Sequence, residues 1–233
     1  MTTTRLDLYA PIHKALRSFM TDTLSRIGRI DVFDSADMAA ALAQLDALLA
    51  LCANHVQHEN DFMHAAIEAR APGAAARIAG EQVQHLAAID ALREESRRLS
   101  DTGDAAQRPP LALRLYRHLA LFVAENFEHM HVEETQHNAV LWAHYSDAEL
   151  AELHGRLLAS VPPHEMLEVA RWMVPALSPT ERAGMLNGAK ADMPPHAFQA
   201  LVGWVRPYLD AAAWAKLAPA IGVAGDPRFA QVG

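Results

Sequence analysis

Histidine and glutamate recur four positions apart in three segments that otherwise read as amphipathic helices. The pairs are His55 and Glu59, Glu81 and His85, and His129 and Glu133. Residues four apart are separated by only about 40° around a helix, so each pair shares one face. Apolar side chains occupy that same face, which predicts that it is buried. A helix with a carboxylate and an imidazole on its buried face requires compensating groups from neighbouring helices, as helix bundles with metal sites provide.

The sequence predicts an all-α chain whose first part holds four long helices. Alanine and leucine are abundant, and runs of β-branched residues are missing. Pro11 suits a first helical position and Ser35 an N-cap. The connections are short or moderate in length, so we expect an antiparallel up-down four-helix bundle. The expected helices cover residues 11–30, 36–70, 74–99 and 111–144.

The heights of the paired residues agree along such a bundle. Glu59 and His85 lie equally far before and after Pro72, so a turn at Pro72 places them level. His85 and His129 also lie at similar distances from the next loop, near Ala105. The first helix carries no pair, but His13 lies on its apolar stripe. These residues therefore form one candidate site rather than separate helix-surface pairs.

We expect a bundle over residues 1–145 and an additional C-terminal helical segment over 146–233. Prolines recur through the second part, and the sequence Ser178-Pro179-Thr180-Glu181 is typical of a helix start. Four or five short helices are predicted there, without a catalytic motif. This segment is expected to cover a face of the bundle or to serve a protein partner or self-association.

Composition limits the function classes. The net charge is −8 and the basic residues are scattered, which argues against nucleic acid as a partner. The single cysteine, Cys52, excludes a cysteine-rich metal site. No uninterrupted apolar run approaches the roughly 20 residues of a membrane span, and no signal peptide is evident. We therefore expect a cytoplasmic protein without a membrane role.

Each His/Glu pair taken alone is as easily an ordinary surface pair. Three carboxylates on core stripes are harder to explain that way, because burying an unpaired carboxylate costs several kcal/mol. The combination therefore favours a two-metal site. Imidazole and carboxylate ligands without a thiolate suit iron or manganese, and zinc is the less natural choice.

The ordered set of motifs resembles the hemerythrin-like (HHE) family over about residues 5–145. The residues that carry the resemblance are His13, His55-Val-Gln-His-Glu59, His85 and His129-Met-His-Val-Glu133-Glu134. The resemblance implies a four-helix bundle around two iron ions bridged by an oxo or hydroxo group. It also implies that His13, His55, His85 and His129 are terminal ligands and that Glu59 and Glu133 bridge the metals.

Two positions leave alternatives open. Oxygen carriers of this family have a histidine where this chain has Glu81, which puts reversible oxygen carriage in doubt. Glu81 is expected either to bind metal or to hydrogen-bond behind a ligand. Glu134 is the alternative to Glu133 as the bridging carboxylate.

Three functions remain in view from the sequence. The first is binding or sensing of dioxygen, peroxide or nitric oxide. The second is catalysis as a di-iron oxidase or peroxidase. The third is a metal-free helical interaction protein, in which the histidine pattern is coincidental.

Overall fold

The computed structural model describes residues 5–226 and 229, without the side chains of residues 77 and 79. Every regular element in these residues is a helix, and none of them lies in a strand. The prediction of an all-α chain is therefore confirmed. The chain divides into two compact units, Met1–Ser160 and Val161–Gly233. The expected boundary at residue 145 falls before helix α7 (Asp147–Ser160), whereas the division in the structure falls after it.

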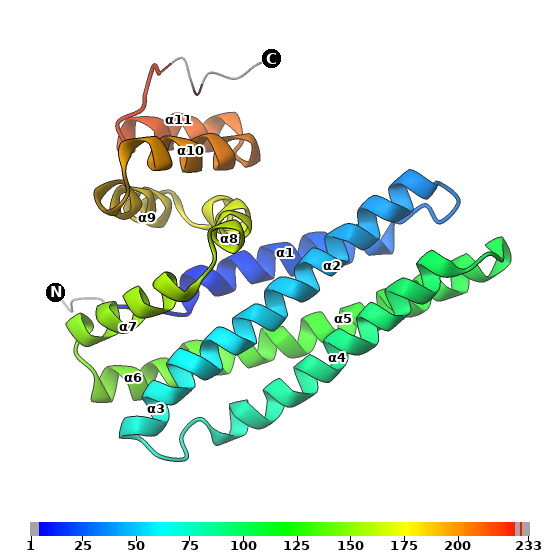
Figure 1. Ribbon diagram of the computed structural model, residues 1–233, viewed down its shortest axis with the longest axis horizontal. Coiled ribbons are helices and arrows are strands. Elements are labelled where there is room, and N and C mark those ends of the chain that lie inside the picture. The colour runs from blue at the N-terminus through cyan, green and yellow to red at the C-terminus, as the bar shows by residue number, and fades with distance from the viewer. Residues whose placement is uncertain (1–4, 227–228, 230–233) are drawn as a thin grey trace. The chain divides into compact units, whose positions relative to one another are not determined.

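The first unit is built around four long helices. Helix α1 (Ala10–Gly28) packs against α2 (Ser35–His58) and α5 (Arg108–Val132), and α4 (Ala76–Asp101) packs against the same two helices (Figure 1). The interior they share is lined by side chains such as Leu16, Leu45, Ile89 and Leu119, which are almost fully inaccessible to solvent. The unit also contains α3 (Ala65–Arg70), α6 (Asn138–His144), α7 and a 3-10 turn η2 (Ala105–Gln107) before α5.

The start of α2 differs by one residue from the predicted cap. Asp34, rather than Ser35, is the N-cap, and its carboxylate accepts hydrogen bonds from the backbone N–H groups of Ala36 and Asp37. An ionised carboxylate also interacts favourably with the positive end of the helix dipole. Both Asp34 and Ser35 are cap-forming residue types, so the sequence alone could not rank them.

Two π-helical turns interrupt the long helices. The segment η1 (Glu59–His64) joins α2 to α3, and η3 (Glu133–His137) joins α5 to α6. In such turns the backbone hydrogen bond joins residues five apart, which widens the helix locally. The sequence predicts uninterrupted helices here, because helical periodicity does not register one extra residue in a turn. Each π-helical turn begins at a glutamate of the candidate site.

By length and composition alone, the helical segment over residues 35–70 could cross a membrane. It contains no long uninterrupted apolar run, because polar residues such as Gln44 and Asp46 divide it. Leu45, Leu48 and Leu49 of this segment are buried inside the first unit. A core helix of a water-soluble protein passes the same test, so the segment is weak evidence for a membrane role.

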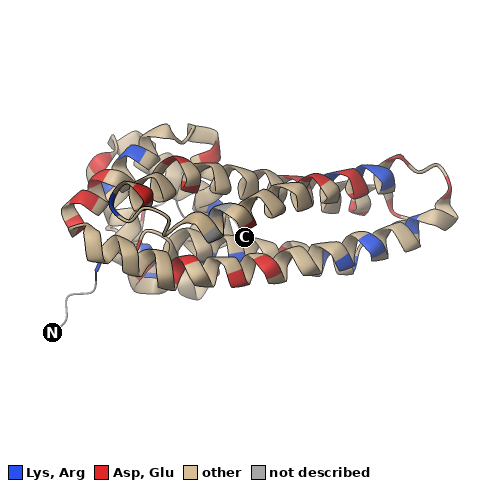
Figure 2. Cartoon of the chain, turned by 90° about the horizontal axis from the view of Figure 1, so that it is seen from below, with Lys and Arg blue, Asp and Glu red and all other residues tan. Residues whose placement is uncertain are grey.

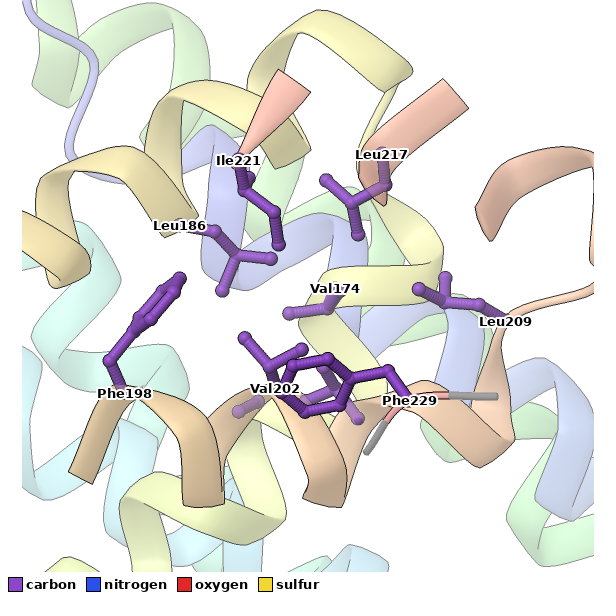
Figure 3. Packing of buried hydrophobic residues seen from close by; sticks show 10 residues of the cluster. Val174, Leu186, Phe198, Val202, Leu209, Leu217, Ile221 and Phe229 are labelled. Atoms are coloured by element: carbon purple, nitrogen blue, oxygen red, sulfur yellow. The ribbon is translucent and has the colours of Figure 1, made fainter. Parts of the chain in front are cut away.

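The second unit consists of short helices around its own hydrophobic core. Three of them begin with a proline at the first position, where its missing N–H costs nothing. The predicted helix start at Ser178 is confirmed as a capping box with Glu181. The helices are α8 (Pro163–Ala176), α9 (Pro179–Asp192), α10 (Pro195–Val205) and α11 (Ala211–Ala220), with a 3-10 turn η4 (Arg206–Tyr208) between the last two. Figure 3 shows Val174, Leu186, Phe198, Val202 and Leu217 converging in this core.

The buried guanidinium of Arg182 closes the C-terminal end of α8. It donates hydrogen bonds to the backbone carbonyls of Val174, Pro175 and Leu177, at 2.6, 2.9 and 2.9 Å. Carbonyls at a helix end lack partners within the helix, so this one side chain satisfies groups that the fold would otherwise leave unpaired.

We expect Arg182→Met to lower the free energy of unfolding of the second unit by about 2–3 kcal/mol, because buried carbonyls lose charged donors. Denaturation followed by tryptophan fluorescence measures this, since the unit contains three of the four tryptophans. Lys216→Met, at an exposed position of the same unit, is the matched control. Equal stability of the two variants would contradict the role of Arg182.

Candidate metal centre

The predicted residues lie on four helices and at the start of both π-helical turns. His13 comes from α1 and His55 from α2, and Glu59 is the first residue of η1. The remaining residues lie on the other two helices: Glu81 and His85 on α4, His129 on α5 and Glu133 at the start of η3.

Four of the seven predicted residues form one buried group. His13, His55, Glu59 and Glu133 each offer a ligand atom, and these atoms all lie within 4.8 Å of one another. His13 Nε2 lies 3.6 Å from a Glu59 oxygen and 3.5 Å from a Glu133 oxygen. His55 Nε2 lies 3.1 Å from Glu59. Residues up to 120 positions apart in the sequence thus converge on one point with the donor set of a cation site.

His85 and His129 adjoin this group. His129 Nε2 lies 3.1 Å from Glu133 Oε1, and the His85 and His129 rings are 4.6 Å apart. Both imidazoles line a small cavity together with His55 and Glu59. Burial and the neighbouring His129 lower the pKa of His85 to about 4, which keeps its imidazole neutral. A neutral imidazole is the form that binds metal.

Glu81 lies on the outer side of His129. Its Oε2 is 3.2 Å from His129 Nδ1, while His129 Nε2 faces Glu133. The Glu81 side chain is 36% exposed, whereas that of Glu133 is 0% exposed. In a neutral ring, a carboxylate that accepts from Nδ1–H leaves the electron pair on Nε2, which here faces the interior. This arrangement is common behind histidine ligands of metals.

Glu134 occupies the corresponding position behind His13. Its Oε1 lies 3.1 Å from His13 Nδ1, and Arg17 donates to both of its oxygens. Burial opposes its ionisation, but the hydrogen bonds from His13 and Arg17 outweigh burial and lower the pKa of Glu134 to about 2. Of the two candidates for the bridging position, Glu133 therefore faces the group, and Glu134 orients His13 from behind.

The two inward carboxyl groups have pKa values shifted in opposite directions. Burial disfavours ionisation of both, but His55 and His13 hold the pKa of Glu59 well below its ordinary value. Burial and the Glu59 charge raise the pKa of Glu133. Gln82 donates to the second Glu59 oxygen at 3.2 Å. A cation between the two carboxylates would offset the charge that the side chains alone do not balance.

Buried polar atoms without hydrogen-bond partners collect at this point. Buried polar atoms are rarely left without a partner, so a cluster of them is an indication of a missing ligand. Their chemistry, imidazole nitrogens and carboxylate oxygens, fits a transition-metal ion. They are His13 Nε2, His55 Nε2, His129 Nε2, Glu59 Oε1 and both Glu133 oxygens.

Two buried histidines near this group were not predicted from the sequence. His64 and His137 lie in η1 and η3, and with Glu133 they form a second group whose ligand atoms are within 4.8 Å. His137 follows Glu133 by four residues, a spacing that could have revealed it. His64 follows Glu59 by five, which in a regular α-helix puts it about 140° away on another face. The π-helical turn, which sequence periodicity does not reveal, changes that placement.

Comparisons with known protein families, with curated proteins and with solved structures find no match for this chain. The geometry of the site and the residue pattern therefore carry the functional argument.

We expect Glu133→Gln to raise the stability of the metal-free protein at pH 7 by about 1 kcal/mol, because it removes a poorly compensated buried charge. The sign follows from linkage: a carboxyl group whose pKa is raised by folding costs stability once it ionises. Urea denaturation in the presence of a chelator measures the change. Glu128→Gln, at an exposed position on α5 shortly before η3, is the control and should have little effect. A loss of several kcal/mol in Glu133→Gln would contradict this account of the site.

Proposed function

We propose that the first unit is a hemerythrin-like four-helix bundle that holds two iron ions and binds or senses dioxygen, peroxide or nitric oxide. The observation that carries the proposal is the buried group of His13, His55, Glu59 and Glu133, whose ligand atoms lie within 4.8 Å of one another. Support also comes from the order of these residues along the chain, which matches the family pattern. Iron is favoured over manganese and zinc by that resemblance.

In this proposal the residues divide into three roles. His13 and His55 would hold one metal ion, and His85 and His129 would hold the other. Glu59 and Glu133 would bridge the pair. When bound, the metals would supply redox chemistry and a Lewis-acidic position for a small ligand.

Glu134 and Glu81 would orient two of the histidine ligands before a metal binds. Glu134 and Glu81 lie at the Nδ1 atoms of His13 and His129, at 3.1 and 3.2 Å, and so set which ring nitrogen carries the proton. Arg17 holds Glu134 in turn. Such partners raise the basicity of an imidazole ligand and stabilise the higher oxidation state of a metal. This favours sensing or redox chemistry over simple oxygen carriage.

The size of the cavity favours a small ligand. Its volume is about 10 Å³, and its walls include the apolar side chains of Leu16, Met20, Val56 and Met130. A volume of this order admits about one water-sized molecule. An organic substrate would require the helices to separate, so a ligand of very few atoms is favoured. Apolar walls also keep bulk water from the reacting atoms.

The expectations about partners and location remain proposals. We propose a cytoplasmic protein without a nucleic-acid or membrane partner. Nucleic acid is disfavoured because acidic and basic residues are interspersed along the helices (Figure 2). A protein partner or self-association is assigned to the C-terminal helices as part of the same proposal. Exposed aromatic side chains there, Trp204 and Tyr208, are consistent with such a surface.

We expect His55→Ala and Glu59→Ala to lose most of the iron that the wild-type protein takes up, because each removes a central donor. Iron per chain after anaerobic loading and desalting is the measurement. His131→Ala, at an exposed position two residues from His129, should retain wild-type iron. Full iron retention in both ligand variants would rule out the assignment.

Reaction with small ligands separates binding from catalysis. We expect nitric oxide to change the absorption spectrum of the reduced, iron-loaded protein in proportion to its iron content, and to be released without turnover. Sustained consumption of peroxide in the presence of a reductant, lost in His85→Ala, would instead support the oxidase or peroxidase alternative.

A further inference from the structure

A second group of potential ligands adjoins the centre described above. His64, Glu133 and His137 are 5%, 0% and 2% exposed, and one ligand atom of each lies within 4.8 Å of the others. The two histidines face each other edge to face, with ring centres 5.3 Å apart. None of the proposed roles for the main centre uses either histidine.

The orientation of His64 is already set for ligation. Its Nδ1 lies 3.2 Å from Asn60 Oδ1, so an Nδ1–H donor leaves Nε2 as the electron-pair donor. His64 Nε2 is buried and has no hydrogen-bond partner. Asn60 thus plays for His64 the part that Glu134 and Glu81 play for His13 and His129.

The backbone explains why these residues meet. His64 ends η1 and His137 ends η3, the two π-helical turns that begin at Glu59 and Glu133. Each turn thus starts at a residue of the main group and ends at a histidine of the second group. π-Helical turns are uncommon and are frequent at functional sites. Packing alone does not readily explain two such turns that each connect the main group to the second group.

The donor set indicates which ligand it would take. Two imidazoles and one carboxylate, with further coordination positions open, are typical of sites for divalent iron or zinc. The Glu133 carboxylate belongs to both groups and has two oxygens, neither with a hydrogen-bond partner. Each carboxylate oxygen has two lone pairs, so Glu133 can bridge the main pair and still offer a lone pair to a further cation, whereas His64 and His137 belong only to the second group.

We propose that His64, Glu133 and His137 form a further metal-binding position for a divalent first-row transition-metal ion, next to the main centre. The position shares Glu133 with that centre but does not require the main centre to hold iron. An additional cation would thus bind beside the main centre, at the end near the π-helical turns.

Zinc binding to the full chain tests this position. Zinc per chain, measured by elemental analysis after dialysis, should fall by one ion in His64→Gln and in His137→Gln relative to the wild type. His131→Gln, exposed and close in sequence, should bind as the wild type does. Undiminished zinc in both variants would overturn the proposal.

The main centre is tested separately in the same experiment. Loss of zinc in His55→Gln but not in His64→Gln would overturn the further position and leave the main centre standing. Loss in His64→Gln but not in His55→Gln would support the further position, and the main centre would then depend on the iron-loading test of His55→Ala and Glu59→Ala. Absence of any zinc binding by the wild type would overturn the further position.

A variant that gains an absorption band distinguishes loss of a metal ligand from failure to fold. His64→Cys replaces the imidazole by a thiolate, which gives an intense charge-transfer absorption when it binds cobalt(II). We expect that absorption in His64→Cys and not in the wild type or in His131→Cys, although all three contain Cys52. Absence of the band in a folded His64→Cys protein that still binds cobalt would refute ligation at this position.

Discussion

The structure depends on placing ionisable side chains inside a hydrophobic helical interior. Glu59 and Glu133 are almost completely buried, and five of the histidines around them are too: His13, His64, His85, His129 and His137. Burying an uncompensated carboxylate costs several kcal/mol, so the surrounding residues must offset that charge. The histidines do so in part, and a bound cation would do so more fully. This cost is the physical reason for the proposal that the interior holds cations.

A layer of outer contacts gives the interior its geometry. Glu134, Glu81 and Asn60 each lie at the Nδ1 atom of a histidine whose Nε2 faces inward or lacks a partner. Arg17 and Gln82 in turn hold the carboxylates of Glu134 and Glu59. Because ring orientation depends on these contacts, the site is organised by hydrogen bonds that do not themselves reach the centre.

The sequence predicted the parts of this molecule that follow regular helical spacing. All-helical structure and the inward placement of His13, Glu59 and Glu133 follow from amphipathic periodicity. The helix start at Ser178 follows from a local capping pattern that needs no tertiary contact. Each of these features depends on residues close together in the sequence, which is why they could be read from it.

Features that depend on irregular backbone or long-range contacts were not predictable in the same way. The π-helical turns at Glu59 and Glu133 shift His64 out of the α-helical register, so periodicity missed it. The placement of Glu81 behind His129 depends on how α4 meets α5, which sequence spacing does not specify. Asp34, rather than the predicted Ser35, is the N-cap of α2, because Asp and Ser are about equally favourable at that position.

The most direct test of the central claim is anomalous diffraction at the iron absorption edge, from crystals of the iron-loaded full chain. We expect iron peaks inside the first unit, within bonding distance of Nε2 of His13 and His55 and of the Glu59 and Glu133 carboxylates. Iron peaks confined to surface histidines, or none in crystals of protein shown to be folded, would contradict it.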